Sequence, residues 1–170
     1  FAAGLNEGEI DLETPFTDLE KKIWCAGNPI GEYDDKIPSD LTAEQILIRS
    51  GNIGSVRIGQ KVGIERYKLF LENLGILNKI EFDIEEVGQP LDFIWGKCKL
   101  ATSSFGHGIT TTPLQLAKAY SIIVNGGYDI NPTLIKKNFK KNDQRNRILK
   151  EEVSKKINSI LRKVVTTDEG

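Results

Sequence analysis

The chain has 170 residues, of which 39% are hydrophobic and 28% charged, and its 23 basic and 24 acidic side chains nearly balance. This composition is typical of a globular domain with one sizeable core, and it does not favour a nucleic-acid partner. The longest nearly apolar run, residues 119–124, is far shorter than the roughly 20 residues that cross a bilayer, and no signal segment is recognised.

The first quarter of the chain contains little helix beyond its opening residues. Residues 1–8 resemble the last turns of a helix that runs into glycine. Residues 9–40 contain Pro15, Pro29 and Pro38, and their hydrophobic residues alternate only in short pieces. This pattern predicts extended segments joined by loops.

The two cysteines, Cys25 and Cys98, lie far apart in the sequence. With a single histidine in the chain, they do not make a zinc-binding pattern, so no metal site is predicted. We expect two buried free thiols, and on that expectation the cysteines do not identify the redox compartment.

Three short helices are predicted next. Thr42 is a good N-cap and Gln45 stands at the capping-box position, which predicts a helix that ends at about Arg49. A second helix is expected over residues 53–62. A third follows from the spacing of hydrophobic residues after residue 65, and Gly75 ends it.

The best-marked helix of the sequence begins at Pro113. Thr112 supplies its N-cap, Gln115 completes a capping box, and the Asn-Gly-Gly of residues 125–127 ends it. Lys118 is its only charged residue, so we expect it to be buried on nearly all sides.

The regions around this helix are less regular. Residues 80–84 are a candidate strand, 88–90 a candidate turn and 130–137 a second candidate strand, whereas the basic run 136–149 reads as a solvated loop. A final amphipathic helix is predicted from the spacing of its hydrophobic residues, which are Leu149, Val153, Ile157, Ile160, Leu161 and Val164.

These elements predict the α+β class, with helices outnumbering strands and no βαβ alternation. The chain contains no methionine, and it begins and stops abruptly. We therefore expect a segment cut from one domain of a longer protein, with some of the strands outside it.

Ser50-Gly51-Asn52 forms the bend between the first two of the three short helices. It is either an ordinary turn or a place where side chains are presented to a ligand, because helices on both sides fix their directions. A serine hydroxyl donates and accepts, and an asparagine amide offers donors and an acceptor, so the pair suits proton relay and a grip on a peptide amide. We expect Gly51 to be small so that the bend can form.

His107, the only histidine, stands between Gly106 and Gly108. A general base needs a nucleophile or an orienting carboxylate, and the sequence assigns neither. We therefore expect a structural role for all three residues, in which the glycines permit either a close backbone approach or positive φ. The spacing does not fit a phosphate-binding loop.

Two stretches carry a family resemblance. "LTAEQILIRSGNIGSVRIGQKVG" (41–63) and "ATSSFGHGITTTPLQLAKAYSIIVNGGYDINPTLIK" (101–136) resemble the transpeptidase domain of class B penicillin-binding proteins, which cross-link peptidoglycan. The resemblance covers nearly the whole chain. It implies a penicillin-binding, serine β-lactamase-like transpeptidase fold of the α+β class, present mostly as its helical part and incomplete at both ends.

The resemblance also implies site residues. Such enzymes use Ser-x-x-Lys, Ser-x-Asn and Lys-Thr/Ser-Gly, and only the second is present here, as residues 50–52. It implies that Ser50 and Asn52 are catalytic and that Asn52 also binds substrate, whereas Gly51, Gly106, His107 and Gly108 support the site. The nucleophile motif and the Lys-Thr-Gly strand are expected outside this chain, which is therefore inactive alone.

The function that the resemblance implies is D,D-transpeptidation by serine acyl transfer, without metal or organic cofactor. The implied partners are stem peptides that end in D-Ala-D-Ala, β-lactam antibiotics, and cell-wall synthesis or divisome proteins. The parent is expected to be anchored in the cytoplasmic membrane, with this domain in the periplasm or extracytoplasmic space. Two alternatives remain: a β-lactamase or β-lactam sensor of the same fold, and a catalytically dead helical interaction module.

Overall fold

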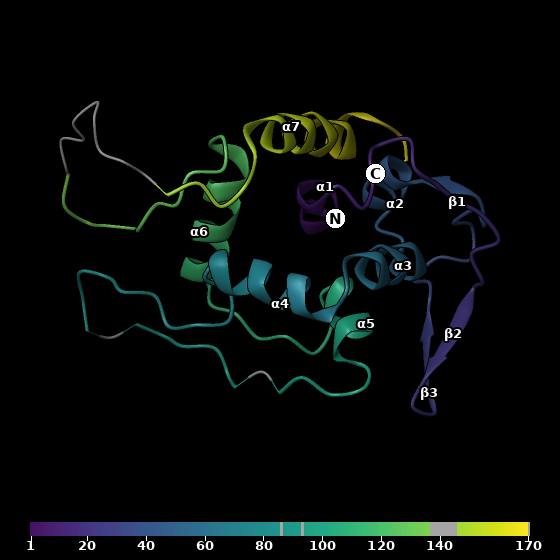
Figure 1. The fold of residues 1–170 in the computed structure, drawn as a ribbon, viewed down its shortest axis with the longest axis horizontal. Helices are drawn as coiled ribbons and strands as arrows, with labels where there is room; N and C mark the ends of the chain where they lie inside the picture. The colour runs from purple at the N-terminus through teal and green to yellow at the C-terminus, as the bar shows by residue number, and fades with distance from the viewer. Residues whose placement is uncertain (86, 93, 137–145, 170) are drawn as a thin grey trace.

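The computed structural model describes residues 1–85, 87–92, 94–136 and 146–169. Its helices form a cluster around the short helix α1, with a β-hairpin at one end and long loops at the other (Figure 1). α1 packs against α3, α4 and α7, and α2 packs against α3 and α7. The helices are α1 (Ala2–Glu7), α2 (Ala43–Ile48), α3 (Asn52–Val62), α4 (Ile64–Asn73), α5 (Lys99–Ser104), α6 (Pro113–Val124) and α7 (Glu151–Thr166).

The strands of the described residues make two small antiparallel pairs. β1 (Pro15–Phe16) pairs with β4 (Leu41–Thr42), and β2 (Lys22–Cys25) pairs with β3 (Asn28–Gly31) in a hairpin. Ile30 of β3 is buried and lies opposite Ile23 of β2, so the face of the hairpin that carries Ile30 packs toward the helices. The prediction of extended segments over residues 9–40 is therefore confirmed.

The predicted helix starts are confirmed in detail. Thr42 accepts a hydrogen bond from the backbone N–H of Gln45 at 3.3 Å, and the Gln45 side chain accepts one from the N–H of Thr42 at 2.9 Å. Thr112 and Gln115 repeat this capping box at the start of α6, with distances of 3.2 and 2.8 Å. These local signals place α2 and α6 because each cap pairs two backbone N–H groups that the helix itself leaves without partners.

The expectation that α6 is buried on nearly all sides is wrong. One stripe of the helix lies in the open, since Leu116 is 45%, Tyr120 51% and Val124 43% exposed. A lack of charge allows burial but does not provide a neighbour to cover each face. The buried face is fixed by Gln115, whose Nε2 atom donates to three backbone carbonyls just beyond α4, those of Gly75, Ile76 and Asn78.

The other irregular regions also differ from expectation. Residues 80–84 and 130–136 form no strand, and residues 88–90 form no turn. The Asp83 carboxylate instead accepts from the Thr133 hydroxyl and the Leu134 N–H, both at 2.6 Å. Apolar alternation does not make a strand without a neighbour to pair with. Most of the basic run, residues 137–145, lies outside the described residues.

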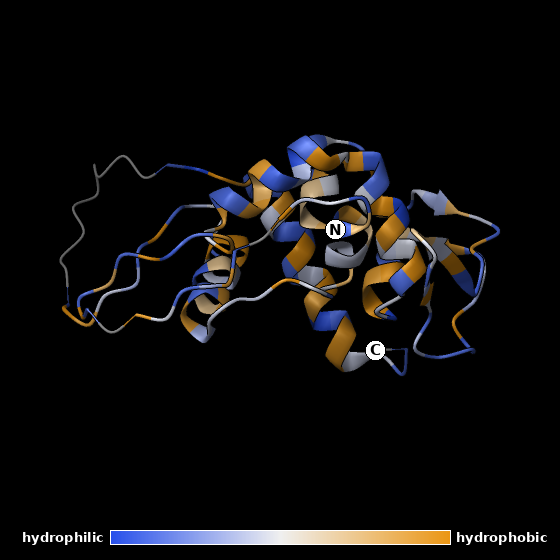
Figure 2. Ribbon diagram, turned by 90° about the horizontal axis from the view of Figure 1, so that it is seen from below, coloured by the Kyte–Doolittle hydropathy of each residue, from blue (hydrophilic) through white to orange (hydrophobic). Residues whose placement is uncertain are grey.

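The final amphipathic helix is confirmed as α7. Val153, Ile157 and Ile160 are buried on its inner face, and Leu149 is buried just before it. Helices with a buried and a solvent face carry orange and blue positions in turn along their length in Figure 2. Among the described residues no helix has both the length and the hydrophobicity to cross a membrane.

The expectation of two buried free thiols is also wrong, because Cys25 and Cys98 form a disulfide with Cα atoms 5.8 Å apart. Neither cysteine is buried. The bond joins the end of β2 to the residue before α5, across 73 positions of sequence. Sequence spacing could not reveal it, because the pairing depends on how the hairpin docks on α5.

Replacing both cysteines with serine should destabilise the protein. A crosslink that closes a loop of this length restricts the unfolded chain, and its removal typically costs about 2–4 kcal/mol. We expect the melting temperature to fall by several degrees in a thermal unfolding experiment. Reducing agent should lower the melting temperature of the wild type in the same way and leave the double variant unchanged; equal melting temperatures for both proteins would contradict the crosslink.

Candidate active site

The turn between α2 and α3 is built by backbone hydrogen bonds at the end of α2. Arg49 is the C-cap of that helix, the N–H of Ser50 donates to the carbonyl of Leu47 at 3.2 Å, and the N–H of Gly51 donates to the carbonyl of Ile46 at 3.0 Å. This pair of bonds is a Schellman motif, which places the residue after the cap in the left-handed region. That residue is Ser50, with φ of +52°.

Ser50 is an unusual choice for this position. Glycine is the usual residue in a left-handed cap, and a residue with a Cβ atom is disfavoured there by about 1–2 kcal/mol. The Ser50 side chain is exposed, and its hydroxyl has no hydrogen-bond partner among the residues that the structure describes. The serine therefore neither relaxes the turn nor caps a helix, which favours a ligand-directed role over a purely structural one.

The expectation that Gly51 must be small for the bend to form is wrong. Gly51 has φ of −63°, which any residue adopts, and a Cβ atom built on it would meet its nearest neighbours at 3.8–3.9 Å. The positive φ that lets the chain turn belongs to Ser50. Gly51 is buried and serves as the N-cap of α3, so its place in the site is structural.

Asn52 is the first residue of α3, and its side chain is held by β3. The Nδ2 atom donates to the backbone carbonyl of Gly31 at 2.9 Å. A carbonyl oxygen only accepts, so this bond fixes which end of the amide faces the strand. The side-chain carbonyl oxygen and the second N–H of Asn52 have no partner in the described part of the chain, and both remain for a ligand.

Two residues that hold the turn, Glu32 and Tyr33, were not predicted from the sequence. The Glu32 carboxylate accepts from the backbone N–H of Asn52 at 2.7 Å and of Ile53 at 2.9 Å, and the Tyr33 hydroxyl donates to the carbonyl of Arg49 at 3.0 Å. One signal pointed to such a partner: Gly51 has no side chain to cap α3, so an acceptor had to come from elsewhere.

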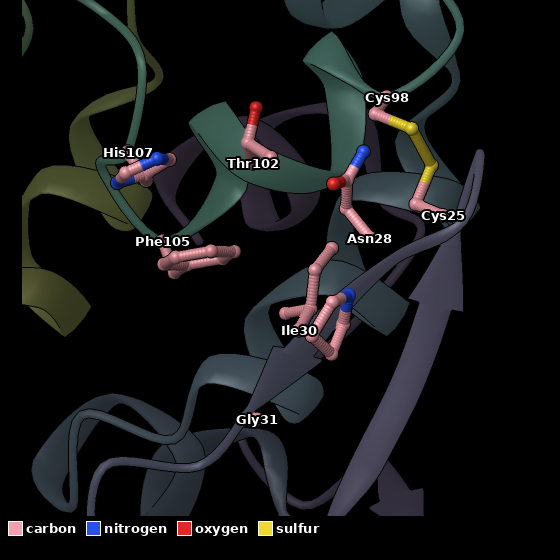
Figure 3. A pocket seen from close by; sticks show the side chains of 9 residues that line it. Cys25, Asn28, Ile30, Gly31, Cys98, Thr102, Phe105 and His107 are labelled. Atoms are coloured by element: carbon pink, nitrogen blue, oxygen red, sulfur yellow. A yellow bond between two sulfur atoms is a disulfide. The ribbon is translucent and has the colours of Figure 1, made fainter.

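A pocket of about 490 Å³ lies between β3 and α5 with the turn that follows it. In Figure 3, Asn28 and Ile30 of β3 face Thr102, Phe105 and His107 across the hollow, with the disulfide at one end. Gly31 lines this pocket and also accepts the hydrogen bond from Asn52. The pocket therefore adjoins the Ser50 turn through Gly31.

His107 is exposed, and its ring stacks on Phe105 with the two centroids 6.1 Å apart. The structure brings it into the pocket but no hydrogen bond joins it to Ser50 or Asn52 within the described residues. Gly106 and Gly108 have φ of +87° and +72°, which is one of the two roles expected of them. Together with the bond from the His107 N–H to the Thr102 carbonyl at 2.9 Å, they shape the turn after α5.

Among the described residues, no three His, Cys, Asp or Glu side chains lie close enough together to hold a metal ion. The chemistry that the turn offers is that of a hydroxyl and an amide, which donate, accept and relay protons.

The chain is similar in sequence to proteins of other organisms. The chain is 31% identical over 132 residues to the probable peptidoglycan D,D-transpeptidase FtsI of Caulobacter vibrioides. This alignment covers 76% of the chain and 22% of that protein. The chain is also 30% identical over 140 residues to the stage V sporulation protein D of Bacillus subtilis. This second alignment covers 74% of the chain and 22% of the relative. The chain thus spans about a fifth of the length of these relatives.

Solved structures share the fold. A transpeptidase domain of penicillin-binding protein 3 from Burkholderia pseudomallei superposes with a TM-score of 0.85 and 20% identity, over 99% of this chain and 51% of that one. Penicillin binding protein 3 of Mycobacterium tuberculosis, in complex with aztreonam, superposes with a TM-score of 0.84 and 21% identity. That superposition covers 98% of this chain and 40% of the other. The α+β transpeptidase fold is confirmed.

The family comparison covers every position. Residues 1–170 match the family described as the penicillin binding protein transpeptidase domain. The Ser-x-Asn turn, held between two helices and a strand, lies within this match. The chain belongs to the penicillin binding protein transpeptidase domain family.

Proposed function

We propose that this chain is an internal part of the transpeptidase domain of a serine peptidoglycan D,D-transpeptidase, and that Ser50 and Asn52 belong to its active site. The observation that carries the proposal is the Ser50 turn. Within a chain that matches the family throughout, a serine occupies a left-handed cap and the described residues use neither its hydroxyl nor the free side of the Asn52 amide.

The reaction is a two-step acyl transfer. A serine hydroxyl attacks the carbonyl carbon of the penultimate D-alanine; the peptide bond breaks, and the terminal D-alanine leaves as an amine that has taken up the serine proton. The amine of a neighbouring strand then attacks the ester; the serine oxygen leaves and regains a proton from that amine. Covalent catalysis of this kind divides one difficult exchange into two easier ones.

No Ser-x-x-Lys occurs in these 170 residues, so the nucleophile belongs to another part of the domain. Ser50 passes the proton toward the leaving amine and from the entering one. Asn52 holds the amide of the substrate with the donor and acceptor that β3 does not use. Gly51, Gly106, His107 and Gly108 support these groups without touching the substrate.

The partners that fit this site are stem peptides ending in D-Ala-D-Ala, β-lactams, and the cell-wall synthesis or divisome proteins that work beside such enzymes. Solved relatives of the fold are described in complex with aztreonam and with ampicillin, which supports the β-lactam assignment. The protein acts on the outer side of the cytoplasmic membrane, to which it is anchored. A disulfide between Cys25 and Cys98 is consistent with that location, because disulfides persist outside the cytoplasm.

Intact-protein mass spectrometry with a labelled penicillin tests the proposal. The full protein that carries this chain should take one label on a serine outside these residues, and the 170-residue chain alone should take none. A stoichiometric adduct on any serine of this chain would overturn the placement of the site. No adduct on the full protein would favour the catalytically dead interaction module.

Replacing His107 with glutamine should leave the second-order rate constant of penicillin acylation within about tenfold of the wild type. Loss of a general base typically removes 10²–10⁴-fold, whereas a histidine that only stacks on Phe105 contributes mainly to the shape of the turn. Stopped-flow acylation of the full protein gives the constant. A loss beyond a hundredfold in a folded variant would make His107 a catalytic group.

A further inference from the structure

We propose that residues 31–33, the segment that leaves β3, are a splint that sets the direction of the Ser50–Asn52 turn, with Glu32 as its main positioning residue. This inference rests on the proposed function, since it assigns the segment a role in acyl transfer through the turn. Three consecutive residues of one segment bind the residues on both sides of Ser50 and Gly51.

Glu32 makes the strongest of these contacts. Its two carboxylate oxygens accept from two successive backbone N–H groups, Oε2 from Asn52 at 2.7 Å and Oε1 from Ile53 at 2.9 Å. A charged acceptor at a helix N-terminus satisfies free N–H groups and interacts favourably with the helix dipole. α3 has no acidic residue in its own first turn and no side-chain cap, so Glu32 supplies both.

Gly31 and Tyr33 extend the contact to either side. The Gly31 carbonyl accepts from the Asn52 side chain at 2.9 Å, and the Tyr33 hydroxyl donates to the Arg49 carbonyl at 3.0 Å. The segment therefore holds the residue before Ser50, the backbone that begins α3, and the amide that faces the substrate. A turn fixed at three points presents its side chains in one direction.

The splint is itself anchored. The N–H of Glu32 donates to the Lys21 carbonyl at 3.2 Å, buried Ile30 packs into the core, and the disulfide joins the far end of the hairpin to α5. α5 in turn packs closely on α3, where a Cβ atom on Gly59 would come within 2.0 Å of the Ser104 hydroxyl. The hairpin and α3 are therefore held to the same support.

The consequence for catalysis is geometric. A displacement of about 1 Å in a group that holds a substrate costs up to about a hundredfold in rate. Glu32 touches no substrate in this proposal, so its removal should act only through Asn52 and Ser50. That expectation separates a positioning residue from a residue that merely stabilises the fold.

The experiment uses the full protein and a chromogenic or fluorescent penicillin, with acylation measured across penicillin concentrations so that the binding constant and the acylation rate are obtained separately. The variants are Glu32→Ala, Glu32→Gln and Glu32→Asp. Gln keeps the shape but offers only one acceptor oxygen, and Asp keeps both oxygens on a shorter stem. Asp34→Asn is the matched control, because the Asp34 carboxylate lies in the same loop and, within the described residues, accepts only from the Lys36 N–H.

We expect Glu32→Ala to lower the second-order acylation constant of the folded protein by about 10- to 100-fold. Glu32→Gln should fall between Ala and wild type, Glu32→Asp should recover part of the loss, and Asp34→Asn should stay within about twofold of wild type. In an Asn52→Ala background, Glu32→Ala should have an effect several-fold smaller than in the wild type, because residues that act through one another are not additive.

Two results would overturn the splint. One is a lower melting temperature in all Glu32 variants with unchanged acylation constants for the folded protein, which would leave only a structural cap. The other is an effect of Glu32→Ala that is equally large with and without Asn52. If Glu32→Ala does not fold, the Gln and Asp variants decide in the same way. A failure of the proposed function is distinguished by Ser50→Ala and Asn52→Ala, which would then leave acylation unchanged.

Discussion

Replacing Ser50 with glycine should make the protein more stable and a much slower target of penicillin. Glycine adopts the left-handed conformation that Ser50 holds at φ +52° without the clash of a Cβ atom. The gain is about 1 kcal/mol once the greater freedom of glycine in the unfolded chain is subtracted. Loss of the relay hydroxyl should slow acylation by about 10²–10⁴-fold, as for other groups that move a proton in the transition state.

Stability and acylation rate, both measured on matched variants, test whether Ser50→Gly gains stability while it loses activity. Ser50→Ala keeps the Cβ atom, so it should lose activity without the gain in stability. Ala26→Gly is the control for the backbone, because Ala26 also has a positive φ, of +47°, at the hairpin turn. It should raise stability like Ser50→Gly while acylation stays unchanged. Normal acylation in Ser50→Gly would mean that the serine is only part of a turn.

Replacing Asn52 with alanine should weaken the binding of penicillin as well as the acylation rate. The amide contacts the substrate already in the bound complex, and an unpaired substrate group costs about 1–3 kcal/mol, or roughly 10- to 100-fold in the second-order constant. The lost bond to Gly31 should also lower stability modestly. The concentration dependence of acylation separates binding from rate.

Asn158→Ala is the matched control for this second change. Its Nδ2 atom also donates to a backbone carbonyl, that of Val124 at 3.1 Å, but on the outer helix α7. It should lose similar stability with no change in acylation. If Asn52→Ala behaves like Asn158→Ala, its amide serves only to hold α3 on β3.

Signals carried by neighbouring residues predicted much of the fold. Thr42 with Gln45 and Thr112 with Gln115 fixed two helix starts, because both partners of a capping box lie within one turn. Positive φ was one of two roles expected for the glycines after α5, and it is found at Gly106 and Gly108. The Ser-x-Asn turn was located between its helices for the same reason.

Features that depend on distant partners were out of reach. Glu32 lies 20 positions from Asn52, and nothing in residues 31–33 by themselves marks them as the support of that turn. The disulfide spans 73 positions, and the exposed stripe of α6 depends on which neighbours its faces meet. The candidate strands over 80–84 and 130–136 failed because a strand requires a pairing partner that local alternation does not supply.

D,D-transpeptidation with Ser50 as a relay is tested most directly by a cross-linking assay on the full protein, with a donor peptide that ends in D-Ala-D-Ala, an acceptor amine, and mass spectrometry of the products. We expect D-alanine and the new amide to appear together, a penicillin to abolish both, and Ser50→Ala to slow both by the same factor. Release of D-alanine with only hydrolysed donor, or no release at all, would contradict this function.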